Sequence, residues 1–269
     1  AVGVYVTEIS MEQLGLALPA AVGLTAVVGL LLPLLLGAIC LRVSGIAFAM
    51  VTLAFAQAGS ILVLKDPSGL TGGEEGLSLT VDRVPDFFIG VFNTANLYWL
   101  ALAYLVVTYA IARWAVNSPP GRVWQAIREN ERRVEVMGFR PYPFKLVVFV
   151  LSSFLATMGG VVYLLVVGGA NPQVTTATFT LVLLVMVVLG GAGTLWGAVL
   201  GGVIYQYLDF RLVSLSNSAT VQDLPAVLRV PLSEPLFILG SLFVLLVIFF
   251  PGGLAGLYRR VSNRFTGSG

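Results

Sequence analysis

The sequence predicts an all-α integral membrane protein with about seven transmembrane helices. Two observations support this fold class. Of the 269 residues, 58% are hydrophobic and only 10% are charged, whereas soluble domains average about 45–50% apolar and about 25% charged residues. Long apolar stretches also recur along the chain, and about 20 apolar residues in a helix are enough to cross a bilayer core. A soluble globular protein is therefore excluded.

We expect one transmembrane domain over residues 1–269, built from seven apolar stretches. The predicted spans are 16–41, 45–64, 97–116, 146–167, 179–189, 196–208 and 236–250. The first is too long for the apolar core of a signal peptide and contains Pro33, which a membrane helix tolerates where neighbours satisfy the freed carbonyl. The fifth and sixth are short, so they can be tilted, discontinuous or re-entrant.

Basic residues in the connections predict the side of the membrane on which each loop lies, because Lys and Arg concentrate on the cytoplasmic side. The connection 118–145, together with Arg113 just before it, carries seven basic side chains. This loop is therefore expected in the cytoplasm. Threading the spans outward from it places Arg42 and the C-terminal tail, with its three arginines, on the same side. The acidic loop 65–95, the connection 209–234 and the N-terminus of the fragment are then external.

The residue types that are missing exclude several classes of function. The chain has no His and a single Cys, Cys40, so disulfides, His-ligated metals and an imidazole base are excluded. Neither of the two lysines lies in a Gly-Lys-Ser/Thr loop, so the chain is not expected to bind ATP as a P-loop protein does. A net charge of +2 provides no broad basic surface for nucleic acid. We predict no catalytic residue, no metal ligand and no nucleic-acid partner.

Two other functional classes are alternatives. A membrane-embedded enzyme would need acids that converge on one site, but the acids here are scattered over the external loops. An ion-coupled carrier or channel would need relay or ion-coordinating residues within the spans, and no charged residue lies in the middle of a predicted span. Both alternatives are therefore disfavoured.

The cytoplasmic loop predicts a short amphipathic helix. Ser118 can cap this helix with Pro119 as its first residue, and Gly138 supplies the stop. Glu129 and Arg133 are spaced to form an i, i+4 ion pair. The apolar positions at helical spacing are Val123, Trp124, Ile127, Val134 and Met137. The helix can lie on anionic lipid, but lipid-binding faces are mostly basic, and the interleaved acids here favour a protein-docking surface.

Four blocks of sequence, in order along the chain, carry further information. They are LRVSGIAFAMVTLAFAQ (41–57), GLTGGEEGL (69–77), AIRENERRVEVMGF (126–139) and GGAGTLWGAVLG (190–201). Together they resemble the permease subunits of branched-chain amino acid ABC importers, and the third resembles the coupling loop of that family. Ala47 and Ala198 stand where the family usually has Tyr and Pro. The family's first helices are missing, so we expect an N-terminal truncation near GVYVT (3–7).

The resemblance implies a mechanism and a set of partners. The chain would be one of two related permease subunits in a bacterial or archaeal cytoplasmic membrane, with two ATPase subunits beneath and an external substrate-binding protein. ATP and Mg would bind to the ATPases, and this chain would need no cofactor. Leu, Ile and Val are the implied substrates, with urea or short-chain amides as the alternative. The residues implied to couple to the ATPase are Ala126, Ile127, Arg128, Glu129, Glu131, Arg132, Arg133 and Gly138.

Two further groups of residues are candidates for a role in transport. The substrate-pathway candidates are Thr52, Phe55, Gln57, Gly72 and Gly73. Gln57 can instead form an interhelical hydrogen bond, and the glycine-rich loop can be a tight turn or a contact for the binding protein. Gly193, Gly197 and Gly201 predict close helix packing, or else a broken helix beside the pathway. Asp209 and Arg211 predict a surface ion pair.

Overall fold

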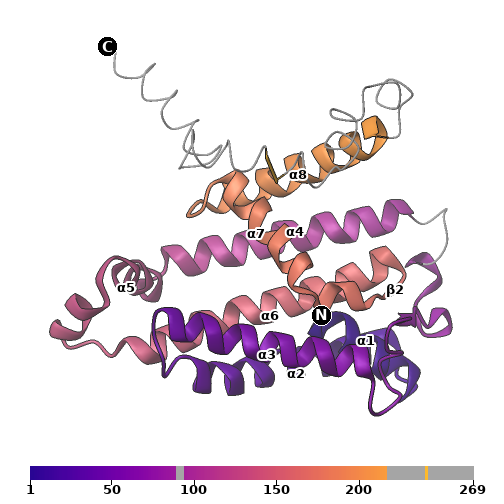
Figure 1. The fold of residues 1–269 in the computed structure, drawn as a ribbon, viewed down its shortest axis with the longest axis horizontal. Helices are drawn as coiled ribbons and strands as arrows, with labels where there is room; N and C mark the ends of the chain where they lie inside the picture. The colour runs from indigo at the N-terminus through magenta and orange to yellow at the C-terminus, as the bar shows by residue number, and fades with distance from the viewer. Residues whose placement is uncertain (89–93, 217–239, 242–269) are drawn as a thin grey trace. The chain divides into compact units, whose positions relative to one another are not determined.

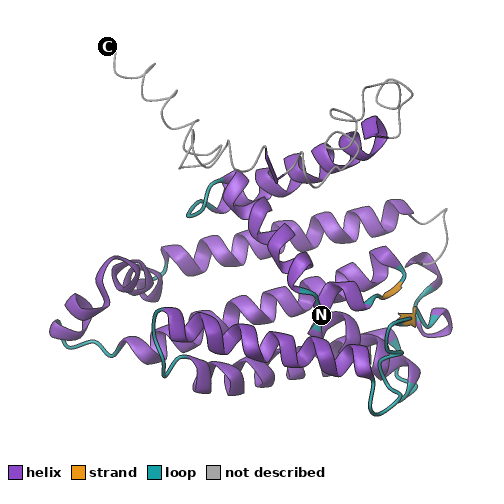
Figure 2. Ribbon diagram, viewed as in Figure 1, coloured by secondary structure: helices purple, strands orange, loops and turns teal. Residues whose placement is uncertain are grey.

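The computed structural model describes residues 1–88, 94–216 and 240–241, and it is mostly helical there (Figures 1 and 2). Four helices in these ranges are long and apolar enough to cross a membrane. They are α2 (Leu18–Cys40), α3 (Ile46–Lys65), α4 (Thr94–Asn117) and α6 (Pro141–Val167). These helices correspond to the first four predicted spans. The predicted external loop 65–95 is slightly too long, because α4 already begins at Thr94.

The fifth and sixth predicted spans form a bent pair of helices. Helix α7 (Ala177–Gly190) and helix α8 (Leu195–Ser216) meet at 118°, and together they make one broken span or a re-entrant loop. With 14 residues, α7 is about 21 Å long at 1.5 Å per residue, which is shorter than a bilayer core of about 30 Å. The described residues therefore support four or five spans. The seventh predicted span, 236–250, and the C-terminal tail lie outside the described residues.

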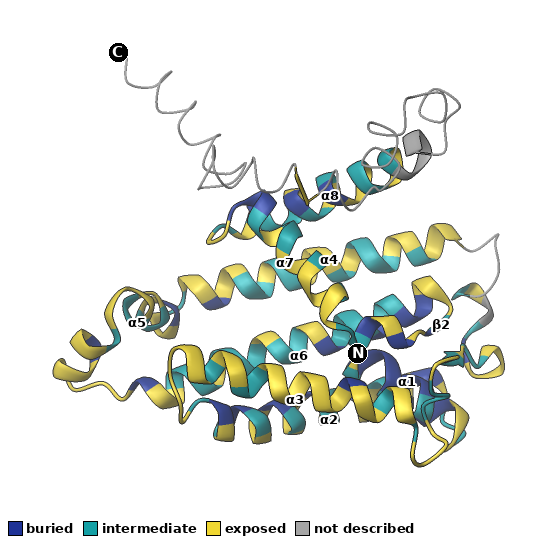
Figure 3. Cartoon of the chain, viewed as in Figure 1, coloured by how far each residue is buried: buried dark blue, intermediate teal, exposed yellow. Residues whose placement is uncertain are grey.

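The chain divides into two compact units, residues 1–177 and 178–269. In the first unit, α6 packs against α2, α4 and α5 (Pro119–Val136), and also against α1 (Val2–Glu12). Helix α1 was not predicted, because polar side chains interrupt its apolar pattern. It is nevertheless one of the most buried parts of the unit, whereas α3 is largely exposed (Figure 3).

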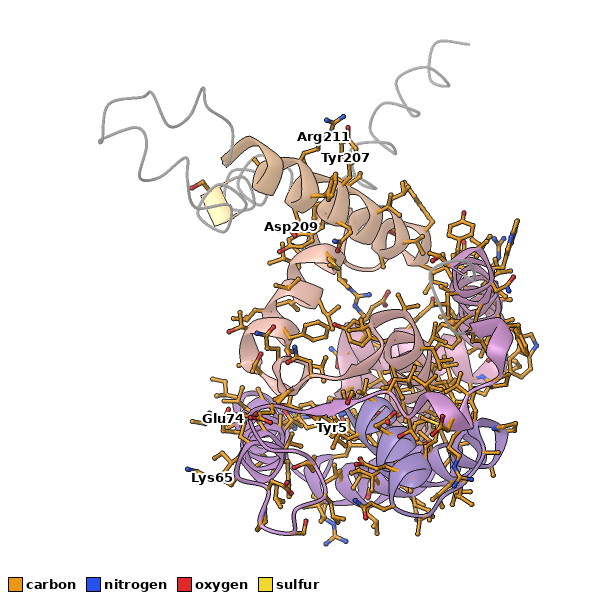
Figure 4. The ribbon with its side chains drawn as sticks, turned by 90° about the vertical axis from the view of Figure 1, so that its right-hand side faces the viewer. Tyr5, Lys65, Glu74, Tyr207, Asp209 and Arg211 are labelled. Atoms are coloured by element: carbon orange, nitrogen blue, oxygen red, sulfur yellow. The ribbon has the colours of Figure 1, made fainter. Side chains whose placement is uncertain are left out.

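Polar side chains of α1 form hydrogen bonds to the segments around it, but the second carboxylate oxygen of Glu8 is buried without a partner among the described residues. The hydroxyls of Thr7 and Thr25 lie 2.8 Å apart, and one carboxylate oxygen of Glu8 accepts hydrogen bonds from the backbone N–H and the hydroxyl of Thr80. The hydroxyl of Tyr5, labelled in Figure 4, donates to the carbonyl of Ala170 at 3.4 Å. Helix α1 is therefore tied to α2 and to the connections that follow α3 and α6.

Two short strands and several 3₁₀ helices lie in the connections at one end of the first unit. Strand β1 (Leu77–Ser78) pairs antiparallel with β2 (Gly169–Ala170). The 3₁₀ helices are η1 (Val81–Arg83), η2 (Asp86–Phe88) and η4 (Pro172–Thr175). The acidic connection and α5 lie at opposite ends of the long helices (Figure 1), which is the arrangement that the predicted orientation requires.

Candidate functional site

The turn between α4 and α5 is fixed by its sequence. The hydroxyl of Ser118 accepts a hydrogen bond from the backbone N–H of Gly121 at 3.3 Å, and Pro119 is the first residue of α5. A Cβ at Gly121 would lie 2.2 Å from the carbonyl oxygen of Val116 and 2.4 Å from that of Ala115. The hydrogen bond confirms the predicted cap at Ser118. Because only Gly fits the close approach to the two carbonyl oxygens, Gly121 sets how tightly α5 folds back on α4.

Helix α5 is not continuous, contrary to the prediction. Asn130 has extended backbone angles (φ −160°, ψ 100°), and its side-chain oxygen accepts a hydrogen bond from the backbone N–H of Arg133 at 3.0 Å. Asn130 therefore caps a second short helix, as Asn commonly does. The predicted i, i+4 pair of Glu129 and Arg133 spans this break, and it is not formed: among the described residues the single ion pair is Glu131–Lys145.

Both halves of α5 are attached to the start of α6. The indole N–H of Trp124 donates to the carbonyl of Phe144 at 2.9 Å, and the ammonium of Lys145 lies 2.5 Å from a carboxylate oxygen of Glu131. The ring of Phe139 meets that of Phe144 edge-on at 6.2 Å between centroids. The loop is therefore held against the end of a long apolar helix.

The loop ends as the sequence predicts. Gly138 has a positive φ of 89°, and its N–H donates to the carbonyl of Glu135 at 2.9 Å. The N–H of Phe139 donates to the carbonyl of Val134 at 3.3 Å. This pair of bonds is a Schellman motif, which needs the left-handed conformation that Gly adopts freely. The predicted stop at Gly138 is confirmed.

An apolar surface is exposed where α5 ends. Val136, Met137 and Phe139 are 85%, 59% and 48% exposed, and of these three only Met137 was among the apolar positions predicted at helical spacing. We call these three residues the loop tip. The sequence pattern did not single out Val136 or Phe139, because they follow the break at Asn130 and the helical register changes there. Of the predicted coupling residues, those exposed beside the tip are Arg128, Glu129, Arg132, Arg133 and Gly138, and those half-buried are Ala126, Ile127 and Glu131.

The glycine-rich loop after α3 is a tight turn built on Asp66. Asp66 ends α3 in the left-handed conformation, and its carboxylate accepts hydrogen bonds from the backbone N–H groups of Leu70, Thr71 and Gly72 at 2.7, 3.1 and 3.0 Å. A Cβ at Gly72 would lie 2.1 Å from the carbonyl oxygen of Gly76. These backbone hydrogen bonds, that of Thr71 foremost, lower the pKa of Asp66 below its usual value.

The lowered pKa of Asp66 predicts a pH-dependent stability of this turn. Folding favours the ionised carboxylate of Asp66. Its contribution to the stability of the turn is therefore present at neutral pH and is lost as the pH falls through the lowered pKa. At pH 7 we expect Asp66→Asn to melt at a lower temperature than the wild type in detergent, and we expect this difference to vanish in scans taken progressively below about pH 4. Asp82→Asn, at an exposed acid in the same loop, is the matched control. A difference that persists at low pH would contradict the prediction.

The pathway candidates are not brought together. The hydroxyl of Thr52 donates to the carbonyls of Phe48 and Ala49 within α3. Gln57 is exposed and makes no hydrogen bond to the described residues, and it lies about 140° around the helix from Thr52 at 3.6 residues per turn. Gly72 and Gly73 are in the glycine-rich turn, beyond the end of α3. Within the described chain, the interhelical hydrogen bond considered for Gln57 is absent.

The glycines of the second unit bring α7 and α8 into close contact. A Cβ at Gly190 would lie 1.8 Å from the carbonyl oxygen of Gly197, and a Cβ at Gly201 would lie 2.0 Å from that of Met186. Gly193 instead lies in the break, with φ 103°. Packing is therefore the role seen for Gly197 and Gly201, and Gly190 is the partner that spacing did not identify.

Asp209 and Arg211 do not form the predicted ion pair. Both lie in α8, two residues apart, and residues at this spacing point to different sides of a helix. The guanidinium of Arg211 instead lies 5.5 Å from the ring centroid of Tyr207 and donates to its hydroxyl at 3.1 Å (Figure 4). Among the described residues, no group of three or more His, Cys, Asp or Glu could hold a metal ion.

The sequence is similar to a protein family and to individual named proteins. Residues 1–250 match a family described as "branched-chain amino acid transport system / permease component". The chain is 27% identical to the high-affinity branched-chain amino acid transport system permease protein LivM of Salmonella typhimurium and 26% identical to that of Escherichia coli. Each alignment covers 96% of this chain and 62% of the relative.

Another relative has a different substrate in its name. The chain is 27% identical to the autoinducer 2 import system permease protein LsrC of Yersinia pseudotuberculosis, over 81% of this chain and 63% of that protein. The chain thus spans less than two thirds of the length of these relatives. No solved structure gives a significant match.

Proposed function

The chain belongs to the family of permease components of branched-chain amino acid transport systems, and we propose that it is the membrane-spanning subunit of an ATP-driven, binding-protein-dependent importer. In this proposal Leu, Ile and Val are the substrates. Two separate ATPase subunits bind ATP and Mg, so the chain is not an enzyme. A second, related permease and an external binding protein complete the complex in the cytoplasmic membrane, with α5 and the C-terminus in the cytoplasm.

The observation that carries this proposal is the loop tip. Val136, Met137 and Phe139 are exposed apolar side chains at the end of a loop that is firmly attached to α6. Exposed charged residues of both signs lie close to them in the sequence, among them Arg132 and Glu135. An apolar centre with a charged rim is typical of protein interfaces, and it supports the docking of a cytoplasmic ATPase here.

A charge placed in the loop tip tests the ATPase contact. We expect Val136→Asp to lower the amount of co-purified ATPase by about tenfold or more, because the few residues that contribute about 2 kcal/mol or more cluster near the centre of an interface and a buried unpaired carboxylate is costly. The matched control is Val81→Asp, at an exposed valine in the loop at the opposite end of the unit. Equal recovery of ATPase with Val136→Asp and the wild type would sink the proposal for this surface.

The substrate requires a separate experiment, because the relatives named for autoinducer 2 import favour a second candidate function for the same machinery. Uptake by the purified complex in proteoliposomes, with its own binding protein, should be compared for labelled leucine, urea and autoinducer 2. Concentrative leucine uptake that depends on ATP supports our proposal. Uptake of urea or autoinducer 2 in preference to leucine would change the proposed substrate and leave the proposed ATP-driven mechanism in place.

The exposed face of α3 is our proposal for the substrate pathway. Gln57 lies on this face without a hydrogen bond, and a polar amide facing lipid would be costly. A water-filled pathway satisfies it. Modification of a Gln57→Cys variant by a water-soluble thiol reagent tests this assignment, since a residue that faces lipid would not react.

A further inference from the structure

We propose that the ion pair of Glu131 and Lys145, with the hydrogen bond of Trp124 to Phe144, is the link through which the loop moves α6. Glu131 is then a positioning residue that acts within this chain and does not itself contact the ATPase. This inference rests on the proposed function, and it differs from what the resemblance implies for Glu131. The resemblance places Glu131 among the residues that meet the ATPase.

The geometry of Glu131 supports an internal role. Its carboxylate lies 2.5 Å from the ammonium of Lys145, although the exposed Arg128 and Arg132 are close to it in the sequence. Those arginines form no ion pair within the described residues. Glu131 is only half-buried, and an isolated pair at such a site would contribute little to stability. The ion pair is important because it joins the second half of α5 to the start of α6.

The ion pair is the polar attachment of the second half of α5, beside the buried Val134, which is 2% exposed, and the ring contact of Phe139 with Phe144. The second half of α5 begins after the extended backbone of Asn130 and ends at Gly138, which has a positive φ. Both ends can therefore change direction. Trp124 anchors the first half to Phe144, and Glu131 anchors the second half to the next residue, Lys145. With both anchors in place, a displacement of the loop tip also displaces the start of α6.

Helix α6 is suited to carry that displacement to the other end of the unit. It packs along α2 and α1. A Cβ at Gly29 of α2 would lie 2.9 Å from the side chain of Thr157, and a Cβ at Gly160 would lie 3.0 Å from the Cα of Gly3 in α1. Lys145 and Gly160 are about 22 Å apart along the helix at 1.5 Å per residue. Close packing of this kind transmits shifts instead of absorbing them.

A charge swap tests the link. The variants are Glu131→Lys, Lys145→Glu and the double variant carrying both, each in the full-length permease assembled with its ATPases and binding protein in proteoliposomes. We expect each single variant to lower leucine uptake per ATP hydrolysed by about 5-fold or more, the lower end of typical coupling between sites. The double variant should recover most of the wild-type ratio. All three should co-purify with the ATPases in normal amounts and elute as monodisperse complexes.

The control is Asp82→Lys, which makes the same charge change at an exposed residue that forms no ion pair with the described residues, and it should leave the uptake ratio near the wild-type value. Failure of the double variant to recover, together with loss of ATPase from Glu131→Lys, would show that Glu131 contacts the ATPase directly and would overturn the inference. Uncoupling by Asp82→Lys equal to that by Glu131→Lys would also overturn it. If the wild type itself recovers no ATPase, the proposed function fails, and this result is visible before any variant is compared.

Discussion

Gly201→Ala is expected to destabilise the protein strongly, whereas Gly202→Ala, at the next residue of α8, is expected to stabilise it slightly. A Cβ at Gly201 would lie 2.0 Å from the carbonyl oxygen of Met186 and 2.6 Å from the backbone nitrogen of Gly190. Both neighbours are backbone atoms, so relief requires α7 and α8 to separate. A Cβ at Gly202 would have no atom within 4 Å.

The two substitutions have the same intrinsic effect on the helix, which makes the comparison direct. Ala is favoured over Gly in a helix interior by about 1 kcal/mol, so Gly202→Ala should raise the melting temperature. At Gly201 the same gain is opposed by overpacking, which typically costs about 1–3 kcal/mol or more. Melting temperatures in detergent, read from the loss of monodisperse protein after heating, measure both. Equal increases for the two variants would show that α7 and α8 do not approach at Gly201.

The glycines of α7 and α8 show how far spacing alone can predict a site. The small-x-x-x-small steps predicted correctly that Gly197 and Gly201 lie at a close helix contact. Spacing describes one helix face and does not identify its partner, so Gly190 was missed. Gly193 was wrongly assigned to that helix face. Gly191 and Gly193 both adopt positive φ, which interrupts the helix, so Gly193 lies in the break between α7 and α8.

The loop between α4 and α6 shows the same division between local and long-range signals. The cap at Ser118 and the stop at Gly138 were predicted correctly, because both depend on residues within one turn. The break at Asn130 was missed, since apolar periodicity continues across it and the capping side chain is visible only in the structure. The pairing of Glu131 with Lys145, 14 residues away, follows from the return of the chain into α6 and has no counterpart in helical spacing.

Gly121→Ala is expected to release the loop that carries the tip. The new Cβ would lie within 2.4 Å of two carbonyl oxygens at the end of α4, so the first turn of α5 must swing away. That movement would pull Trp124 from the carbonyl of Phe144. We expect trypsin to cut after the exposed Arg122 and Arg128 about tenfold faster in inside-out membranes, since a local opening that is about 1.4 kcal/mol easier raises its population tenfold.

Gly59→Ala is the matched control for this experiment, because Gly59 lies within α3 and a Cβ there would have no atom within 4 Å. It should leave the cleavage rate unchanged. Under the proposed ATPase contact, the Gly121 variant should also retain less ATPase than the wild type, because the tip keeps its position only while both halves of α5 are held on α6. Faster cleavage with normal ATPase binding would separate the two effects: the corner at Gly121 would then order the loop without setting the position of Val136, Met137 and Phe139. Unchanged cleavage would mean that α5 leaves α4 along a path that does not require Gly at this corner.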